Sequence, residues 1–225
     1  MTTATGKIGV IFDLDGVIID TSEFHKKSWF DLAEKEGFEI TSEFFYNTFG
    51  MQNYQIIPIL AGQDVPPEEI ERLSQWKEQR YRDLIDDKSI LAPGAKDLLA
   101  DLKRRGFLLA IGSSAPRANL DFVLERIHVG HYFDAFVVGE DVKHGKPAPD
   151  TFVKAAEKLA LPPDRCVVVE DAMAGVQAAK KAGMTVIALT TTRPRKDLQQ
   201  ADLIVDSLSE LKAQNFINLI NNLNP

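Results

Sequence analysis

The chain has 225 residues, of which 44% are hydrophobic, and it carries a formal net charge of -7. This length and apolar content suit one large domain or a domain that carries a smaller insertion. The acidic balance argues against nucleic acid or an anionic membrane surface as the main partner, because no basic stripe is present to neutralise phosphates. An anionic ligand would therefore need a local binding site that offsets this negative charge.

The single cysteine, Cys166, lies in an apolar run, so we expect a buried, inert thiol and no disulfide within the chain. Residues 1–7 are polar, and aspartates interrupt the apolar stretch that follows. This pattern predicts neither a signal peptide nor a membrane span. We expect a cytoplasmic protein that is a monomer or a weak homodimer.

The first predicted element is a buried strand over residues 8–12, which is rich in β-branched and aromatic residues. It stops abruptly at Asp13, Asp15 and Gly16. Ligands collect at the carboxyl ends of the strands in open α/β sheets, so these carboxylates are well placed for chemistry. An ordinary turn is the alternative, because Asp and Gly are also turn residues.

A helical segment follows the first strand. The spacing of apolar residues predicts a helix over residues 22–35, with Ser22 as its cap. A second helix is predicted from Pro67, which precedes two glutamates, as far as Ile85. No convincing strand is predicted between residues 21 and 87.

Beyond Pro93 and Gly94, which open a helix, strands and helices alternate. The predicted strands cover residues 107–111, 135–138, 166–169, 185–189 and 203–205, and a last helix lies within residues 210–225. This alternation predicts an α/β fold with a doubly wound, Rossmann-like parallel sheet.

The sheet core would comprise residues 1–20 and 88–225, and residues 21–87 would form a helical cap inserted after the first strand. An insertion at the carboxyl end of a strand lies over the active face of the sheet. We therefore expect it to act as a lid that excludes water and selects the substrate.

Two later strand ends supply groups that complement the first pair of aspartates. Ser113 and Ser114 precede a helix, where hydroxyl and backbone N–H groups form an anion site or, alternatively, an ordinary helix cap. Lys146 stands between a glycine and two prolines, which reduces the entropy lost in fixing its ammonium group. The alternative is a solvated loop in which Asp150 caps the next helix.

Glu170 and Asp171 end a further strand, although Asp171 could instead be a helix N-cap. Four carboxylates at one sheet edge would repel one another without a cation. Mg²⁺ favours hard oxygen ligands and bridges carboxylates to a phosphate. With Asp13 as nucleophile and Asp15 as acid/base, the arrangement predicts covalent phosphoryl transfer.

Four motifs in this order resemble those of the haloacid dehalogenase-like superfamily. They are Asp13-Leu14-Asp15-Gly16-Val17, the strand end at Ser113, Lys146-Pro147-Ala148-Pro149-Asp150, and Glu170-Asp171. The position and size of the helical insertion resemble the branch that holds β-phosphoglucomutase and many sugar-phosphate phosphatases.

The resemblance implies that Asp13 attacks phosphorus to form an aspartyl-phosphate. Asp15 would protonate the leaving oxygen and then activate water or a second hydroxyl, and Ser113, Ser114 and Lys146 would bind the transferring phosphoryl group. The implied ligands of Mg²⁺ are Asp13, the backbone carbonyl of Asp15, Asp171, and Glu170 directly or through water. Dehalogenases and phosphonate-cleaving relatives usually lack an aspartate at the position of Asp15, so phosphoryl transfer is favoured over carbon–halogen chemistry.

The resemblance is less decisive within the insertion. Thr21 and His25 match positions that, in β-phosphoglucomutase, help to hold the acid/base aspartate out of reach until the lid closes. A packed or solvated histidine is the alternative. Gly50 matches the glycine of the family, but Asn53 stands in place of the lid arginine with which the mutase grips the non-transferring phosphate, and an amide cannot replace that bidentate cation.

Other cations could compensate for the missing arginine. Lys77 and Arg80 are the candidates within the insertion, although charges on a helix usually form a solvated face. Arg193 and Arg195 are likewise interpreted as charges on a solvated surface.

Three functions are weighed. The preferred one is a Mg²⁺-dependent phosphatase of a small phosphorylated metabolite, expected to be a sugar phosphate. A β-phosphoglucomutase-type transfer to another hydroxyl of the same sugar is supported by His25 and opposed by the missing arginine. A phosphoaspartyl signalling module, like a receiver domain, is disfavoured because it has no use for Asp15 or for a lid.

Overall fold

The computed structural model describes residues 6–85 and 90–223. The predicted border between cap and core, at residues 87 and 88, lies outside these ranges. The same is true of most of the polar start of the chain and of its last two residues.

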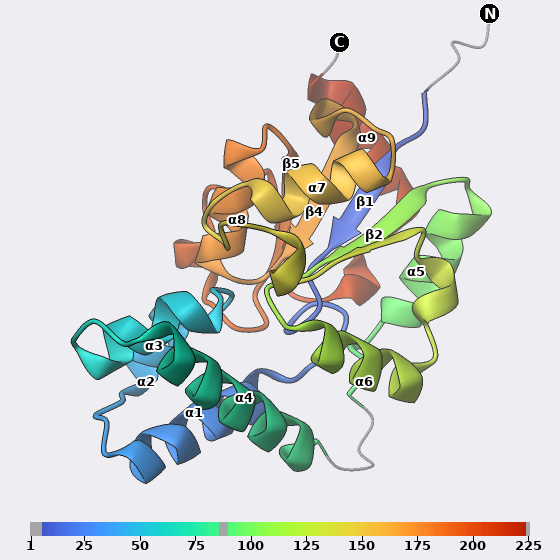
Figure 1. Cartoon of the computed structure of the whole chain (residues 1–225). Helices are drawn as coiled ribbons and strands as arrows, with labels where there is room; N and C mark the ends of the chain where they lie inside the picture. Colours follow the sequence, from blue (N-terminus) through green and yellow to red (C-terminus); the bar gives the residue numbers. More distant parts are fainter. Residues whose placement is uncertain (1–5, 86–89, 224–225) are drawn as a thin grey trace, which may run out of the picture.

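A six-stranded parallel sheet forms the centre of the molecule, in the order β3-β2-β1-β4-β5-β6 (Figure 1). Its strands are β1 (Gly9–Phe12), β2 (Leu108–Gly112), β3 (Ala135–Val137), β4 (Cys166–Glu170), β5 (Thr185–Leu189) and β6 (Leu203–Val205). The predicted α/β class and doubly wound sheet are confirmed, and the strand ends differ from the expected ones by at most one residue. The strand order reverses between β1 and β4, which is where ligands bind in such sheets.

Helices cover both faces of the sheet. One face carries α5 (Ala95–Arg104), α6 (Arg117–Ile127) and α9 (Ala213–Leu223), and the other carries α7 (Asp150–Lys158) and α8 (Met173–Lys181). Successive strand residues point to opposite faces, so Val10 and Phe12 join the first layer and Ile11 joins the second. Single turns of 3₁₀ helix occur at Gly130–Tyr132, Gly139–Asp141, Pro163–Arg165, Arg195–Asp197 and Leu208–Glu210.

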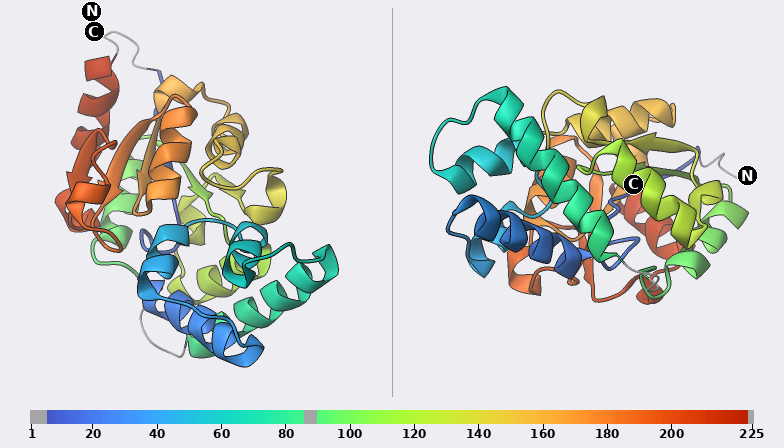
Figure 2. Two further views of the ribbon diagram at one scale, coloured as in Figure 1. Left: turned by 90° about the vertical axis from the view of Figure 1, so that its left-hand side faces the viewer. Right: turned by 60° about the horizontal axis from the view of Figure 1, so that its bottom comes forward.

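Four helices between β1 and α5 form a separate layer beyond the carboxyl ends of the strands (Figures 1 and 2). They are α1 (Ser22–Glu36), α2 (Ser42–Thr48), α3 (Asn53–Ala61) and α4 (Pro67–Leu84), and we call them the α1–α4 unit. Their apolar faces share a core of their own, built around Trp29, Phe45, Ile57 and Leu73. No strand occurs in the described part of this segment, residues 21–85.

The two chain connections between the sheet and the α1–α4 unit run side by side. Ile19 forms an isolated bridge with Leu91, and the backbone N–H of Asp20 donates to the carbonyl of Ile90 at 2.8 Å. The helix that follows begins at Ser22 with Thr21 at the N-cap, so the prediction that Ser22 caps it was wrong by one residue. The Thr21 side chain makes no capping bond, and its hydroxyl donates to Asp15.

Cys166 is buried in β4, and burial raises the pKa of its thiol to about 12. The thiol therefore stays protonated near neutral pH, as expected for an inert cysteine. Among the described residues, no helix combines the length and the apolar character that a membrane crossing requires.

Candidate active site

β1 delivers Asp13 and Asp15 to the middle of the carboxyl edge of the sheet. The backbone N–H of Asp13 donates to the carbonyl of Val169 at 2.9 Å, which continues the ladder between β1 and β4. Gly16 then turns the chain with a φ of 85°. A Cβ atom at Gly16 would lie 2.0 Å from Oδ2 of Asp171, so the turn packs directly on that carboxylate and only glycine fits.

Lys146 joins three strand ends through its ammonium group. Its Nζ donates to Oδ1 of Asp13 at 2.6 Å, to Oε1 of Glu170 at 2.7 Å and to the carbonyl of Gly112 at 3.1 Å. Burial alone would lower the pKa of Lys146, but Asp13 and Glu170 outweigh it and hold this pKa above the usual range. Lys146 is thus a buried cation, and the alternative of a solvated loop was wrong.

The loop that carries Lys146 is fixed at both of its sides. Asp150 is the first residue of α7, not its N-cap, and its Oδ2 accepts from the backbone N–H of His144 at 3.2 Å. On the other side, the N–H of Gly145 donates to the hydroxyl of Tyr54 in α3 at 2.9 Å. The lysine is therefore held by contacts with both α7 and the α1–α4 unit.

Asp13, Glu170 and Asp171 form a buried acidic cluster whose ligand atoms lie within 4.8 Å of one another. Neither carboxylate oxygen of Asp171 has a hydrogen-bond partner, although the residue is fully buried. Burial, and then repulsion from Glu170 and Asp13, raise the pKa of Asp171 well above its usual range. Ala172 is the N-cap of α8, so the N-cap alternative for Asp171 was wrong.

The cluster fits a divalent cation. Burial raises the pKa of Asp13 to about 7 against the opposing effect of Lys146, and one ammonium cannot balance three carboxylates. Glu170 Oε2 already accepts from the backbone N–H groups of Asp171 and Ala172, at 2.8 and 2.9 Å. The two unpartnered oxygens of Asp171 are hard donors of the kind that Mg²⁺ and similar ions prefer.

The two serines after β2 have different partners. Ser113 is buried, and its Oγ accepts from the backbone N–H of Ala115 at 3.0 Å, which leaves the hydroxyl proton for another acceptor. Ser114 donates its hydroxyl to the carbonyl of Gly50 at 2.6 Å, so it connects the sheet edge to the α1–α4 unit. Binding of a phosphate by the Ser114 side chain would require this bond to break.

A cavity of about 50 Å³ separates the sheet edge from the α1–α4 unit. It is lined by Asp13, Asp15, His25, Trp29, Phe45, Thr48, Phe49, Gly50, Met51, Asn53, Ile56, Lys77, Glu78, Ser113, Ser114 and Ala115. Pockets for small molecules usually measure about 300–1,000 Å³. The cavity as it stands is therefore too small for a sugar phosphate.

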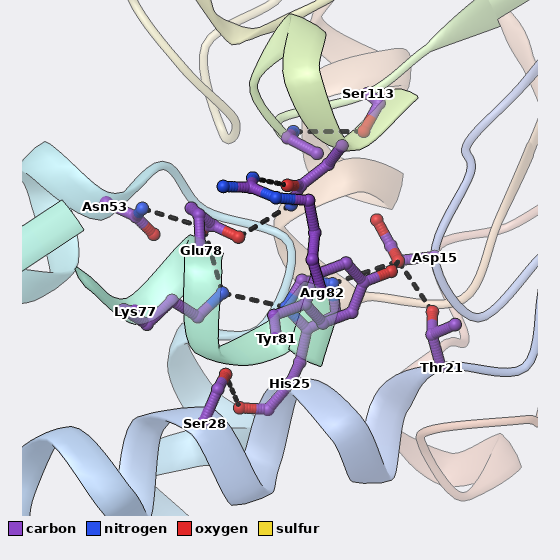
Figure 3. A network of polar contacts seen from close by, with 12 residues as sticks. Asp15, Thr21, His25, Ser28, Asn53, Lys77, Glu78, Tyr81, Arg82 and Ser113 are labelled. Atoms are coloured by element: carbon purple, nitrogen blue, oxygen red, sulfur yellow. Dashed lines mark hydrogen bonds and ion pairs between the residues drawn. The ribbon is translucent and has the colours of Figure 1, made fainter. Parts of the chain in front are cut away.

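Asp15 is turned toward the α1–α4 unit (Figure 3). Its Oδ1 accepts from Thr21 Oγ1 at 2.6 Å and from the Tyr81 hydroxyl at 2.8 Å, and it lies 3.0 Å from Nε2 of His25. Burial alone would raise the pKa of Asp15, but the charge of His25 and these hydrogen bonds lower it to about 2. Asp15 is thus held ionised by α1, α4 and the residue before α1.

Tyr81 was not singled out from the sequence as a site residue. It stacks on His25 with ring centroids 3.8 Å apart and is completely buried. Its position on the apolar face of the predicted helix indicated burial, but not a hydrogen bond to Asp15.

We expect Tyr81→Phe to keep the stack on His25 and to remove one donor from the Asp15 carboxylate. Hydrogen bonds to charged groups contribute about 1.5–3 kcal/mol, so the free energy of unfolding should fall by that amount. Urea denaturation followed by circular dichroism measures the loss. A variant as stable as the parent chain would show that the phenol does not support Asp15.

Lys77 reaches the cavity and Arg80 does not. Lys77 is buried, with its Nζ 2.8 Å from Nδ1 of His25 and 2.9 Å from Oε1 of Glu78 (Figure 3). A solvated face was therefore the wrong interpretation for Lys77. Arg80 is partly exposed and pairs with Asp31 at 2.7 Å.

Glu78 and Asn119 complete the polar network, and sequence reasoning missed both. Oε1 of Glu78 accepts from Asn53 Nδ2 at 2.8 Å, and Oε2 accepts from Asn119 Nδ2 at 2.6 Å. Asn119 Oδ1 accepts in turn from Arg82 at 2.6 Å. Because Asn119 belongs to α6 and Glu78 to α4, this chain of bonds joins the sheet core to the α1–α4 unit.

The two later arginines differ from each other. Arg193 donates to the carbonyl of Tyr46 and to Oδ1 of Asn47, so it contacts the α1–α4 unit and its solvated interpretation was wrong. Arg195 is exposed and pairs with Asp206 at 3.0 Å, as expected for a solvated residue.

The chain is similar in sequence and in fold to known proteins. A family described as haloacid dehalogenase-like hydrolase matches residues 10–189. The chain is 33% identical to a β-phosphoglucomutase of Bacillus subtilis, with 90% of each chain covered, and 32% identical to a fructose-1-phosphate phosphatase of Escherichia coli, with 80% of this chain and 94% of the relative covered. A crystal structure of β-phosphoglucomutase from Clostridium difficile superposes with a TM-score of 0.88 at 29% identity, covering 97% of this chain and 99% of that one.

Proposed function

The chain belongs to the haloacid dehalogenase-like hydrolase family, and from this membership we propose that it is a Mg²⁺-dependent phosphatase of a small phosphate monoester. As a member of the β-phosphoglucomutase-like branch, it is a phosphoryl-transfer enzyme. The substrate we propose is a sugar phosphate, because relatives are named for fructose 1-phosphate and for phosphorylated carbohydrates.

One observation carries the proposal. The carboxylate of Asp13 lies against the buried ammonium of Lys146, and Asp13 lines the cavity together with Ser113 and Asp15. A nucleophile, a cation for the phosphoryl oxygens, a hydroxyl donor and a second carboxylate are thus gathered at one sheet edge. Phosphoryl transfer depends mainly on such positioning and charge compensation.

In the proposed first step, an oxygen of Asp13 forms a bond to phosphorus as the bond to the leaving oxygen breaks. Lys146 and Ser113 hold the phosphoryl oxygens, and Asp15 gives a proton to the leaving oxygen. In the second step, Asp15 takes a proton from water, whose oxygen attacks the aspartyl-phosphate and restores Asp13. Mg²⁺, held by Asp13, Glu170, Asp171 and the backbone carbonyl of Asp15, would offset the charge of the phosphoryl oxygens.

Asp15 must leave its partners on the α1–α4 unit before it can donate a proton. While Thr21, His25 and Tyr81 hold it, its low pKa keeps it ionised. We propose that residues 21–87 act as a cap on a core of residues 1–20 and 88–225. Movement of this cap would control both the entry of the substrate and the protonation of Asp15.

The test is phosphate release from a panel of sugar phosphates, nucleotides and pyrophosphate, with Mg²⁺ and with a chelator in its place. β-Glucose 1-phosphate is assayed in parallel for conversion to glucose 6-phosphate. Release from sugar phosphates that needs Mg²⁺ and occurs without isomerisation would support the phosphatase. No release from any monoester would refute it.

A second candidate is a phosphomutase that returns the phosphoryl group to another hydroxyl of the same sugar. The contacts of Asp15 with Thr21 and His25 favour it, because they keep the acid/base carboxylate unavailable to water while the substrate exchanges. Asn53, which is not a cation, opposes it. Isomerisation without net phosphate release would establish this alternative.

We expect Asp15→Asn to trap the phosphoenzyme. An asparagine cannot accept a proton from water, so the second step should slow by at least about 100-fold. p-Nitrophenyl phosphate is the substrate of choice, because its leaving group departs without being protonated. The first step can therefore proceed in a variant that lacks the acid. Intact mass spectrometry should detect one added phosphoryl group on Asp15→Asn and none on the Asp13→Asn, Asp15→Asn double variant. Normal dephosphorylation would exclude Asp15 as the base.

A further inference from the structure

Glu78 stands between the inner cavity and an outer groove. The groove, with a volume of about 720 Å³, runs between α3, α4, the loop that precedes α6 and the segment that follows β3. Glu78, Asn53 and Ser114 line both spaces. A substrate whose phosphate reaches Asp13 and whose body extends toward the groove must therefore pass Glu78.

The carboxylate of Glu78 is fixed and ionised. Asn53 and Lys77 donate to one oxygen and Asn119 donates to the other, at 2.6–2.9 Å. Burial alone would raise the pKa of Glu78, but the charges of Lys77 and His25 and these hydrogen bonds lower it. A carboxylate offers about four acceptor sites, so room remains for one more donor, such as a substrate hydroxyl.

The cations near Glu78 already donate hydrogen bonds within the protein. Lys77 is the single lysine or arginine among the described residues that line the cavity, and its Nζ contacts His25 and Glu78. Arg82 is the single lysine or arginine among the described residues that line the groove. Its guanidinium donates hydrogen bonds to the side-chain oxygens of Asn119 and Gln79.

The groove carries more negative than positive charge. Glu71 and Glu140 line it together with Glu78, against the single guanidinium of Arg82. A second phosphate on the substrate would face the buried carboxylate of Glu78, and the one guanidinium of the described lining is outnumbered by three carboxylates.

We propose that Glu78 is a specificity-determining residue that limits the substrate to one phosphate on an uncharged, hydroxyl-bearing body and excludes bisphosphates. The inference rests on the proposed phosphatase function and narrows its substrate class. It also opposes the mutase, in which a sugar carrying two phosphates would have to occupy the same space.

The experiment measures inhibition of p-nitrophenyl phosphate hydrolysis by fructose 1-phosphate and by fructose 1,6-bisphosphate. The ratio of the two inhibition constants reports selectivity, and damage that weakens both ligands equally leaves it unchanged. We expect the parent chain to bind the bisphosphate at least about tenfold more weakly, and Glu78→Gln to reduce this ratio by about tenfold. Glu68→Gln, which neutralises an exposed carboxylate on the same helix outside the groove lining, should leave the ratio unchanged.

Asn53→Lys provides a second test, because it places a new cation beside Glu78 and should also improve bisphosphate binding. If circular dichroism shows that Glu78→Gln does not fold, the ratio of inhibition constants measured for Asn53→Lys tests the inference instead. Equal binding of the two ligands by the parent chain, or an unchanged ratio in the folded variants, would overturn the inference and leave the phosphatase standing. Failure of the parent chain to hydrolyse any monoester would instead refute the proposed function.

Discussion

Asp13→Asn is expected to reduce phosphate release by at least about 1,000-fold while the chain remains folded. The amide cannot form the acyl phosphate, but its oxygen can still accept from Lys146, whose Nζ lies 2.6 Å from Oδ1 of Asp13. The substitution also removes one of three crowded buried carboxylates, so the loss in folding free energy should be small.

Steady-state phosphate release and thermal unfolding of the same preparation check this result. Asp164→Asn is a suitable control, because Asp164 is exposed in the 3₁₀ turn before β4, at the opposite end of the strand from the site. Residual activity within tenfold of the parent chain would remove Asp13 as the nucleophile.

Lys146→Met is expected to abolish activity and to lower the free energy of unfolding by about 3–5 kcal/mol. The methionine has a comparable length but no charge, so Asp13 and Glu170 lose the cation that is buried with them. The loss follows from leaving charges uncompensated in the interior, not from lost packing.

Urea denaturation with and without Mg²⁺ separates these contributions, because a bound cation should restore part of the stability. Adding Glu170→Gln to Lys146→Met should also recover part of the loss, since the two residues are in contact and their effects are not additive. Lys96→Met, at an exposed position of α5, serves as the control. A Lys146→Met variant as stable as the parent chain would contradict the role of the ammonium.

The sheet and its edge could be predicted because the signals are local. Short apolar runs mark each strand, and the residues that end them follow at once in the sequence. Asp13, Glu170 and Asp171 therefore meet for a topological reason: the carboxyl ends of parallel strands share one edge.

The polar network of the α1–α4 unit could not be predicted in this way. Lys77 and His25 are 52 residues apart, and Glu78 and Asn119 are 41 residues apart. A charged side chain on an amphipathic helix gives the same pattern whether it faces water or a polar cavity, so the sequence alone leaves both interpretations of Lys77 open. Its burial depends on how α4 packs against α1, which periodicity does not encode.

The paired connections at Ile19 and Leu91 make the α1–α4 unit modular. With the N–H of Asp20 bonded to the carbonyl of Ile90, the chain leaves the sheet and returns to it at one point. The insertion therefore joins the sheet as a surface loop would, with its two ends adjacent. The register of the strands does not depend on which residues the insertion contains. Exchange of this unit between relatives would thus change which molecules are admitted, while the chemistry at the edge of the sheet stays the same.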